Sequence, residues 1–335
     1  MDLKALSLSL GLSPTTVSRA LNGYSDVSEL TRARVVEAAA RLGYRPNASA
    51  RRLAMGRADA VGMVYPPGSA DLADPRFTEV VTGLSERLQD EGIELLIATS
   101  ARAEEISTYE RLVRGRRFDA LIVARTRRVD PRVDFLLAQG FPFLACGRGE
   151  NPTGYAWFDF DHAAGSLLAL RRLQAFGHRH IGYLHASLDH NEAYERHASF
   201  RRGLREIGLE ENPAWTLPAE GRHGGYDAAR ALLALPGRPS ALLVDQAAAG
   251  AGVARALAER GLVPGRDLSV IVFDGVPPEQ LPPGLAMTSI EQPAGAEAGR
   301  AMAAMILDVL AGRPASEVQQ LWMPALMPGN SDGPA

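Results

Sequence analysis

The sequence has very little cysteine: Cys146 is the only one among 335 residues. A single thiol cannot form an internal disulfide or supply a cysteine-based metal cluster, which favours a reducing compartment. We expect Cys146 to be a small buried side chain. The start of the chain lacks the charged and then apolar pattern of a secretory signal, and no apolar run approaches the roughly 18 residues of a membrane span. These absences predict a globular protein of the cytoplasm.

Motifs that mark enzymes are also missing. We find no Walker phosphate loop, no G-x-G-x-x-G after the first expected strand, no nucleophile elbow and no histidines or cysteines at metal-ligand spacing. The seven histidines are scattered, and the glycine-rich stretch 221–225 follows no clear strand. We therefore expect no catalytic residues, no bound metal and no cofactor.

Charge is divided unevenly along the chain, although the formal net charge is only −3. Residues 1–57 hold nine bases and four acids, a formal charge of +5, whereas the remainder holds 27 bases and 35 acids, or −8. A basic head on an acidic body predicts that a polyanion binds the head alone. A chance cluster of solvated arginines is the alternative that composition leaves open.

Three short helices are predicted in the first 43 residues. The first carries Leu3, Leu6 and Leu10 on one face, and the third runs from about Ser28 to Leu42. We expect the third helix to turn Val35, Val36 and Ala39 inward. Helix starts are marked by capping residues and proline, and helix stops by glycine or asparagine. These signals are Asp2, Gly11, Ser13, Pro14, Asn22, Gly23 and Gly43.

From Ala60 onward, short apolar runs alternate with amphipathic helices, which predicts parallel sheets with helices on both faces. Two such halves, about 60–160 and 161–290, indicate two lobes with a cleft where ligands meet the carboxyl ends of the strands. A last helix is expected at 294–312, and the tail after Pro324 is expected to fray. The expected strands are 61–65, 94–98, 120–124, 181–185, 241–244 and 269–273; the helices are 77–91, 104–114, 132–138, 162–176, 193–207, 226–235 and 247–260.

The stretch 10–23 joins two of the short helices by a tight glycine turn, so that the second helix projects its N-terminal end. A helix of that size fits the major groove of DNA, and its first turn meets base edges. Thr15, Thr16 and Ser18 are short donors and acceptors. Arg19 suits a bidentate contact to guanine, worth roughly 1–3 kcal/mol of discrimination. An ordinary helical hairpin is the alternative that spacing leaves open.

Three strings of residues resemble the lactose/galactose-repressor (LacI/GalR) family of bacterial transcription regulators. They are Ser-Pro-Thr-Thr-Val-Ser-Arg-Ala-Leu-Asn-Gly, Arg-Ala-Arg-Val-Val-Glu-Ala-Ala-Ala-Arg-Leu-Gly-Tyr-Arg-Pro-Asn and Ala-Arg-Arg-Leu, in the family's order and spacing. The resemblance extends from Leu3 to about Met323. It implies an N-terminal all-α helix-turn-helix head and an α/β periplasmic-binding-protein-like core of two doubly wound parallel-sheet lobes.

The resemblance also implies domain boundaries. Residues 1–45 would form the DNA-binding domain, 46–58 the hinge helix and linker, and 59–328 the effector-binding and dimerisation domain. Within the last, the N-lobe would take about 60–160 with about 291–320. The C-lobe would take about 161–290 with the C-terminal segment.

For DNA, the resemblance implies that Thr15, Thr16, Ser18 and Arg19 read bases and that Asn22 supports a backbone contact. Residues 47–54 would form a hinge helix that orders only on DNA, which couples DNA affinity to lobe geometry. Leu53 would wedge between the central base pairs in the minor groove, flanked by Ala50 and Arg51. Without the resemblance, Leu53 would read as an ordinary linker leucine.

For the effector, the resemblance implies a cleft lined by Asp, Arg and Gln. Such side chains suit a polyhydroxyl ligand, because carboxylates accept from hydroxyls and guanidinium groups donate in a fork. Asp161 and Asp245 have an alternative role as helix caps, Arg125 and Arg148 as surface arginines, and His178 reads as a structural turn residue. The expected effector-binding residues are Phe77, Arg125, Arg148, Asp161, Arg196, Asp245, Asp274 and Gln292.

Three positions depart from the family pattern. Val244 and His162 stand where many relatives carry Asn, and Gly275 replaces a frequent Asp. The pair Arg125-Thr126 and the stretch 141–148 resemble relatives that sense α-glucosides and similar disaccharides.

We therefore expect a repressor of carbohydrate-uptake or catabolism genes that a mono- or disaccharide releases from a palindromic operator. A homodimer is expected, because a two-fold dimer presents two equal heads and no heptad helix follows Gly312. An activator or co-repressor-type regulator with a nucleobase or sugar-phosphate ligand is the alternative. A transporter-type solute-binding protein and an enzyme rank lower. The sign of the coupling between ligand and DNA stays open.

Overall fold

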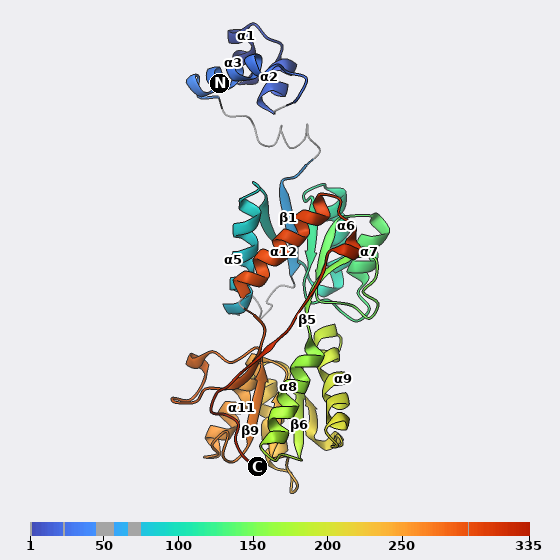
Figure 1. Cartoon of the computed structure of the whole chain (residues 1–335), viewed down its shortest axis with the longest axis vertical. Helices are drawn as coiled ribbons and strands as arrows, with labels where there is room; N and C mark the ends of the chain where they lie inside the picture. The colour runs from blue at the N-terminus through green and yellow to red at the C-terminus, as the bar shows by residue number, and fades with distance from the viewer. Residues whose placement is uncertain (1, 23, 45–56, 66–74, 294) are drawn as a thin grey trace. The chain divides into compact units, whose positions relative to one another are not determined.

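The computed structural model describes residues 2–22, 24–44, 57–65, 75–293 and 295–335. Figure 1 shows its helices and strands and labels many of them. The chain divides into two compact units, Met1–Asp59 with Gly115–Asp119 and Ala60–Arg114 with Ala120–Ala335. The predicted hinge residues Ala50, Arg51 and Leu53 lie outside the described residues. No helix in the described ranges is long and apolar enough to cross a membrane.

The first unit contains three helices, α1 (Leu3–Leu10), α2 (Pro14–Leu21) and α3 (Glu29–Arg41). The predicted caps are confirmed: Asp2 accepts from the Ala5 amide at 2.8 Å, and Ser13 accepts from the Thr16 amide at 3.0 Å. Gly11 adopts the left-handed conformation at the end of α1. Each cap satisfies a helix N–H that lacks an intrahelical partner, so these short helices start and stop where the sequence predicts.

The head buries one apolar side chain from each helix at its centre, Leu6, Val17 and Val35. The prediction for Val36 is wrong, because its side chain is exposed. One residue along a helix rotates the side chain by about 100°, so Val35 and Ala39 face the core and Val36 turns to solvent.

The first lobe of the second unit is built on a six-stranded sheet in the order β11-β5-β4-β3-β1-β2, and every neighbouring pair is parallel. Helices α5 and α12 lie side by side (Figure 1). A Cβ at Gly83 or Gly299 would overlap a backbone oxygen of the facing helix, so glycine permits this close approach. The elements of the lobe are β1 (Ala60–Tyr65), α5 (Pro75–Gln89), β2 (Glu94–Thr99), α6 (Glu105–Arg114), β3 (Ala120–Val123), α7 (Pro131–Gln139), β4 (Phe143–Cys146), β5 (Ala156–Phe160), α12 (Gly295–Leu310) and β11 (Gln319–Trp322).

The second lobe repeats the plan with the order β12-β10-β9-β8-β6-β7, in which only β10 and β12 pair antiparallel. Its hydrophobic core includes Leu243, Ile271 and Phe200. Its elements are α8 (His162–Ala175), β6 (Ile181–His185), α9 (Asn191–Glu206), β7 (Thr216–Pro218), α10 (Gly221–Leu233), β8 (Ala241–Val244), α11 (Ala247–Glu259), β9 (Ser269–Phe273), β10 (Thr288–Glu291) and β12 (Ala325–Met327). The expected fold class is confirmed.

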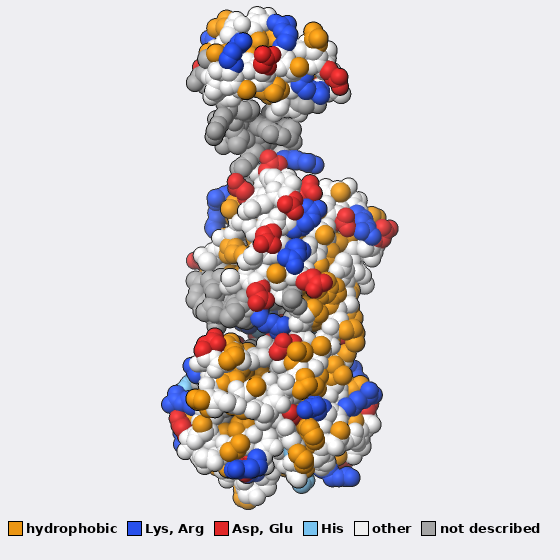
Figure 2. Space-filling view, turned by 60° about the vertical axis from the view of Figure 1, so that its left-hand side comes forward, with side chains coloured by type: hydrophobic (Ala, Val, Ile, Leu, Met, Phe, Trp, Pro, Cys, Tyr) orange, Lys and Arg blue, Asp and Glu red, His pale blue; other side chains and the backbone are white. Residues whose placement is uncertain are grey.

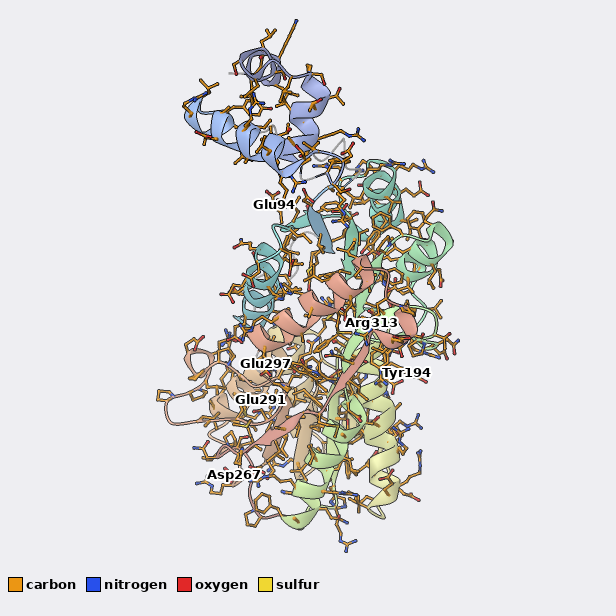
Figure 3. All side chains as sticks on the ribbon, turned by 45° about the horizontal axis from the view of Figure 1, so that its top comes forward. Glu94, Tyr194, Asp267, Glu291, Glu297 and Arg313 are labelled. Carbon is orange, nitrogen blue, oxygen red and sulfur yellow. The ribbon has the colours of Figure 1, made fainter. Side chains whose placement is uncertain are left out.

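The chain passes between the two lobes three times, from β5 to α8, from β10 to α12 and from β11 to β12. Glu291 and Glu297, labelled in Figure 3, stand on either side of the second passage. The first and third passages are joined by a hydrogen bond from the Asp161 amide to the Trp322 carbonyl, at 2.9 Å. These connections therefore lie next to the carboxyl ends of the parallel strands in both sheets.

Three expectations need correction. The helix predicted to begin at residue 226 begins at Gly221, and its Gly225 fits directly against the Ala249 backbone of α11. The tail does not fray: β12 joins the second sheet, and Ser331 and Gly333 bond to β9. Cys146 is only half-buried at the end of β4, although burial raises the pKa of its thiol to about 12.

Candidate DNA-binding head and effector cleft

Helix α2 presents a polar face because its two buried residues, Val17 and Ala20, are apolar and face the core of the head. On the rest of the helix, Thr15 and Arg19 are exposed and Thr16 is half-buried beside its cap. Asn22 donates weakly to the Ser18 hydroxyl, at 3.4 Å, at the end of the helix. The predicted base-reading side chains therefore lie on the solvent face of α2.

Arg19 is held by groups of the head itself. Its guanidinium forms an ion pair with Asp26 at 2.8 Å and lies 5.4 Å from the centre of the Tyr24 ring. Both partners of the ion pair are about half-exposed, so the interaction is weak and exchangeable. Figure 2 shows basic and acidic side chains together on the face of the head turned to the viewer, so the basic residues do not form one continuous patch on that face.

In the second lobe, Arg196 organises a buried polar cluster at the carboxyl ends of β8 and β9. The side chain is only 3% exposed. It donates to the Asp245 carbonyl oxygen at 2.8 Å and to a carboxylate oxygen of Asp274 at 3.1 Å, and its guanidinium lies 4.3 Å from the centre of the Phe273 ring. The sequence analysis expected Arg196, Asp245 and Asp274 to line the effector cleft, and the structure brings the three side chains together.

The two carboxylates of this cluster differ in exposure. Asp245 is buried, and burial raises the pKa of its carboxyl group although Arg196 opposes the shift. Asp274 keeps 25% of its side chain exposed and adopts a left-handed backbone conformation with φ 66°. Asp274 is therefore the carboxylate that a ligand hydroxyl can reach.

Arg76, in the first turn of α5, contacts the same carboxylate from the first lobe. It donates to Asp274 at 3.1 Å and to the backbone carbonyl of Gln292 at 2.6 Å. Sequence reasoning missed Arg76, because nothing in its local pattern distinguishes it from a solvent-facing arginine. Gln292 enters this arrangement through its backbone and not through the predicted side chain.

A cavity of about 100 Å³ lies at the carboxyl ends of the first-lobe strands. Arg125, half-buried with φ 52°, lines it, and its carbonyl oxygen accepts from Arg132 at 3.0 Å. Arg132 is buried and binds Asp130 through two nitrogens and Glu105 through a third. The polar side chains lining the cavity are Tyr65, Ser100, Arg102, Glu105, Arg125, Arg127, Arg132 and His190.

A larger pocket of about 310 Å³ lies elsewhere in the second lobe, against α11. Of the side chains that line it, only Asn330 is polar, and the others include Leu262, Pro282 and Leu285. Specific binding of a polar ligand requires several convergent polar groups. The smaller cavity and the Arg196 cluster are therefore the better candidate for the effector site.

Arg148 is half-buried after β4 and pairs with a buried carboxylate of β5. Its Nε donates to Asp159 at 2.7 Å, and its guanidinium lies 5.3 Å from the centre of the Trp157 ring. Burial by itself would raise the pKa of Asp159, but hydrogen bonds from His162 and Arg148 outweigh burial and hold the pKa below its ordinary value. Sequence reasoning missed Asp159, which lies within a strand that it did not predict.

The remaining predicted residues have structural roles in this arrangement. Asp161 caps α8 by accepting from the Ala164 amide at 2.9 Å, whereas Asp245 does not cap α11, whose N-cap is Gln246. Phe77 meets the Tyr65 ring edge-on, with ring centres 4.7 Å apart. His178 is buried and bonds to Ser240, Ser269 and the Gly333 carbonyl, which agrees with the structural role expected for it.

A three-helix head with an exposed polar recognition helix, followed by a two-lobed α/β body with a polar cleft, defines a ligand-responsive DNA-binding regulator. Residues 8–47 match the model of bacterial regulatory proteins of the lacI family, and residues 170–331 match a periplasmic binding protein-like domain. The chain belongs to the lacI family of bacterial transcription regulators.

Three relatives illustrate the match. The HTH-type transcriptional regulator RafR of Escherichia coli is 38% identical over 332 residues, covering 99% of this chain and 98% of RafR. The regulator AglR of Rhizobium meliloti (strain 1021) is 34% identical, covering 100% of this chain and 95% of AglR. The solved complex of the regulator CelR with cellobiose is 26% identical with a TM-score of 0.75, covering 99% of both chains.

Proposed function

We propose that this regulator represses carbohydrate-uptake or catabolism genes and that a mono- or disaccharide in its cleft releases it from a palindromic operator. We infer the effector class from the Arg196 cluster, in which the guanidinium groups of Arg76 and Arg196 converge on the partly exposed carboxylate of Asp274. Such groups bind vicinal hydroxyls, since the carboxylate accepts and the guanidinium donates. The cellobiose bound by the structural relative CelR supports the same class.

Charge in the cleft favours a neutral ligand. Arg76 and Arg196 contact Asp274, Arg127 contacts Glu105 at 2.6 Å, and Arg148 contacts Asp159. Because carboxylates already balance these guanidinium groups, a sugar phosphate would add charge without a matching surplus of cations. The proposed effector-binding residues are Phe77, Arg125, Arg148, Asp161, Arg196, Asp245, Asp274 and Gln292.

A thermal-shift screen of the purified protein tests the effector class. Maltose, cellobiose, other mono- and disaccharides, sugar phosphates and purines would each be added in turn. A ligand at 100 times its Kd stabilises the folded state by about 2.7 kcal/mol, which raises the melting temperature by several degrees. Stabilisation by a saccharide supports the proposal; stabilisation only by purines or sugar phosphates would replace it with the alternative.

For DNA, we propose that Thr15, Thr16, Ser18 and Arg19 read bases, that Asn22 supports a backbone contact, and that Ala50, Arg51 and Leu53 act in the minor groove. Selection of bound sequences from a random DNA pool would give the operator. Leu53→Ala should then weaken binding of the selected operator, because the minor-groove wedge is lost. An unchanged affinity would refute the wedge.

For assembly, we propose a homodimer that uses the outer edge of the first-lobe sheet. Within the described residues, strand β2 pairs on one side only, with β1, and it leaves Leu96 and Ile97 42% exposed. An apolar unpaired edge strand favours pairing with another chain. Sedimentation should show that Ile97→Lys dissociates the dimer, whereas Leu137→Lys, at an equally exposed leucine of α7, leaves it intact.

We also propose the domain division 1–45, 46–58 and 59–328, with no enzymatic activity and a cytoplasmic location, where operator DNA is found. Limited proteolysis without DNA should cut first within 46–58 and release a stable body that starts near Asp59. Early cuts elsewhere would refute these boundaries.

A further inference from the structure

His162 occupies the first passage between the lobes, as the first residue of α8, and its side chain is buried. The residue before it, Asp161, caps α8, and the strand before that contributes Asp159. A buried imidazole at this point lies between the Arg148–Asp159 pair of the first lobe and the Arg196 cluster of the second.

Both ring nitrogens of His162 have partners. Arg196 Nε lies 3.2 Å from Nδ1, and an Asp159 carboxylate oxygen lies 3.3 Å from Nε2. An arginine side chain carries donors only, so Nδ1 must offer its lone pair. The ionised carboxylate accepts only, so the ring proton must reside on Nε2.

We propose that His162, as the neutral tautomer protonated on Nε2, is a positioning residue of the effector cleft. By accepting from Arg196 Nε it fixes the orientation of the guanidinium whose other nitrogens face Asp245 and Asp274. By donating to Asp159 it joins that guanidinium to Arg148 across the passage between the lobes. The tautomer follows from the hydrogen-bond partners alone, whereas the consequence for ligand affinity rests on the proposed saccharide site.

The two bonds can be removed separately. The Oδ1 of an asparagine takes nearly the place of imidazole Nδ1, so His162→Asn keeps an acceptor for Arg196 and loses the contact to Asp159. The Nε2 of a glutamine takes nearly the place of imidazole Nε2, so His162→Gln keeps the donor to Asp159. His162→Leu keeps neither bond while it fills a similar volume.

Nitrogen-15 NMR of histidine-labelled protein tests the tautomer without any ligand. The resonances that disappear in His162→Asn should show the coupling pattern of a neutral ring protonated on Nε2. The control is His223→Asn on the surface of α10, which should remove a different set. A His162 ring protonated on Nδ1, or on both nitrogens, overturns the proposal.

Calorimetric titration with maltose and cellobiose tests the consequence. Because a buried hydrogen bond to the charged Arg196 is lost, His162→Leu and His162→Gln should lose about tenfold or more in affinity. His162→Asn should stay within about threefold of the parent protein, because Arg196 keeps its acceptor. Equal losses in the three variants overturn the positioning role. If the parent protein binds neither sugar, the titration is repeated with the saccharide that the thermal-shift screen identifies. If no saccharide binds, the proposed effector class fails, and a ring protonated on Nε2 still supports the tautomer.

Discussion

Replacement of Arg132 by methionine should destabilise the first lobe severely. Arg132 is 3% exposed and donates to Asp130 at 2.6 and 2.8 Å, to Glu105 at 3.1 Å and to the Arg125 carbonyl at 3.0 Å. Methionine fills a similar volume without any donor, so it leaves a buried carboxylate without its cation. Removal of one partner from a buried ion pair costs about 3–5 kcal/mol.

The expected loss lies near the lower end of that range. Glu105 keeps its contact with Arg127 at 2.6 Å, and Asp130 keeps hydrogen bonds from the backbone amides of Arg127 and residue 132. We therefore expect the free energy of unfolding to fall by about 3 kcal/mol near pH 7. Urea denaturation followed by circular dichroism measures this loss. Arg114→Met is the control, because Arg114 is 79% exposed and 3.8 Å from Glu110, and it should cost less than about 1 kcal/mol.

The loss should also depend on pH with a definite sign. Burial would raise the pKa of Asp130, but the hydrogen bond and charge of Arg132 outweigh it, so the native pKa lies below the ordinary value. A depressed carboxyl pKa stabilises the fold above the unfolded pKa of about 3.9, and this stabilisation is lost as pH falls through the lower native pKa. The difference between parent and variant should therefore shrink below about pH 4. A loss under about 1 kcal/mol near pH 7 would refute the reasoning.

Three further perturbations follow from the same structure. Gly299→Ala should lower the free energy of unfolding by about 1–3 kcal/mol in urea denaturation, because a Cβ there overlaps the facing helix. The control Gly237→Ala has open space around it and should be nearly neutral, so equal effects would contradict the close packing of α5 and α12. A double-mutant cycle on Arg76 and Asp274 should give a coupling of about 0.5–1 kcal/mol for this quarter-exposed pair, and zero coupling would remove the link between lobes. Asp332→Ala should lower the melting temperature, because its fully buried carboxylate binds Arg172 and Thr288; an unchanged melting temperature would mean that the tail adds no stability.

The head could be predicted nearly completely from the sequence because its structure is determined locally. Asp2 and Ser13 cap helices within three residues of themselves, and Gly11 ends a helix through its own backbone conformation. The body was predicted only where apolar runs are long. The strand at 156–160 was not predicted because Asp159 interrupts its apolar pattern. The buried Asp159 carboxylate is stabilised there by contacts with Arg148, His162 and the Phe160 amide.

The residues of the candidate effector site were also only partly predictable from the sequence. Asp245 and Asp274 could be placed together because they follow β8 and β9, which are parallel neighbours in one sheet, so that their carboxyl ends meet at one edge. Arg76 could not be placed with them from the sequence, because its partner Asp274 lies 198 residues away and belongs to the other lobe. The structural role of Asp161 was also undecidable, since an aspartate before a helix caps it or binds a ligand with the same local sequence.

The ion pair between Arg19 and Asp26 has a consequence for the proposed base-reading role of Arg19. Before Arg19 can reach a base, its guanidinium group must break the ion pair with the Asp26 carboxylate. Guanine, with two acceptors on one edge, compensates for that loss, whereas a cytosine amino group, being a donor, does not. In that proposed role, Asp26 acts as an internal competitor for Arg19, so the affinity gained from a guanine contact is reduced by the cost of breaking the ion pair. The net strength of this base contact is then set partly by a residue that need not contact DNA at all.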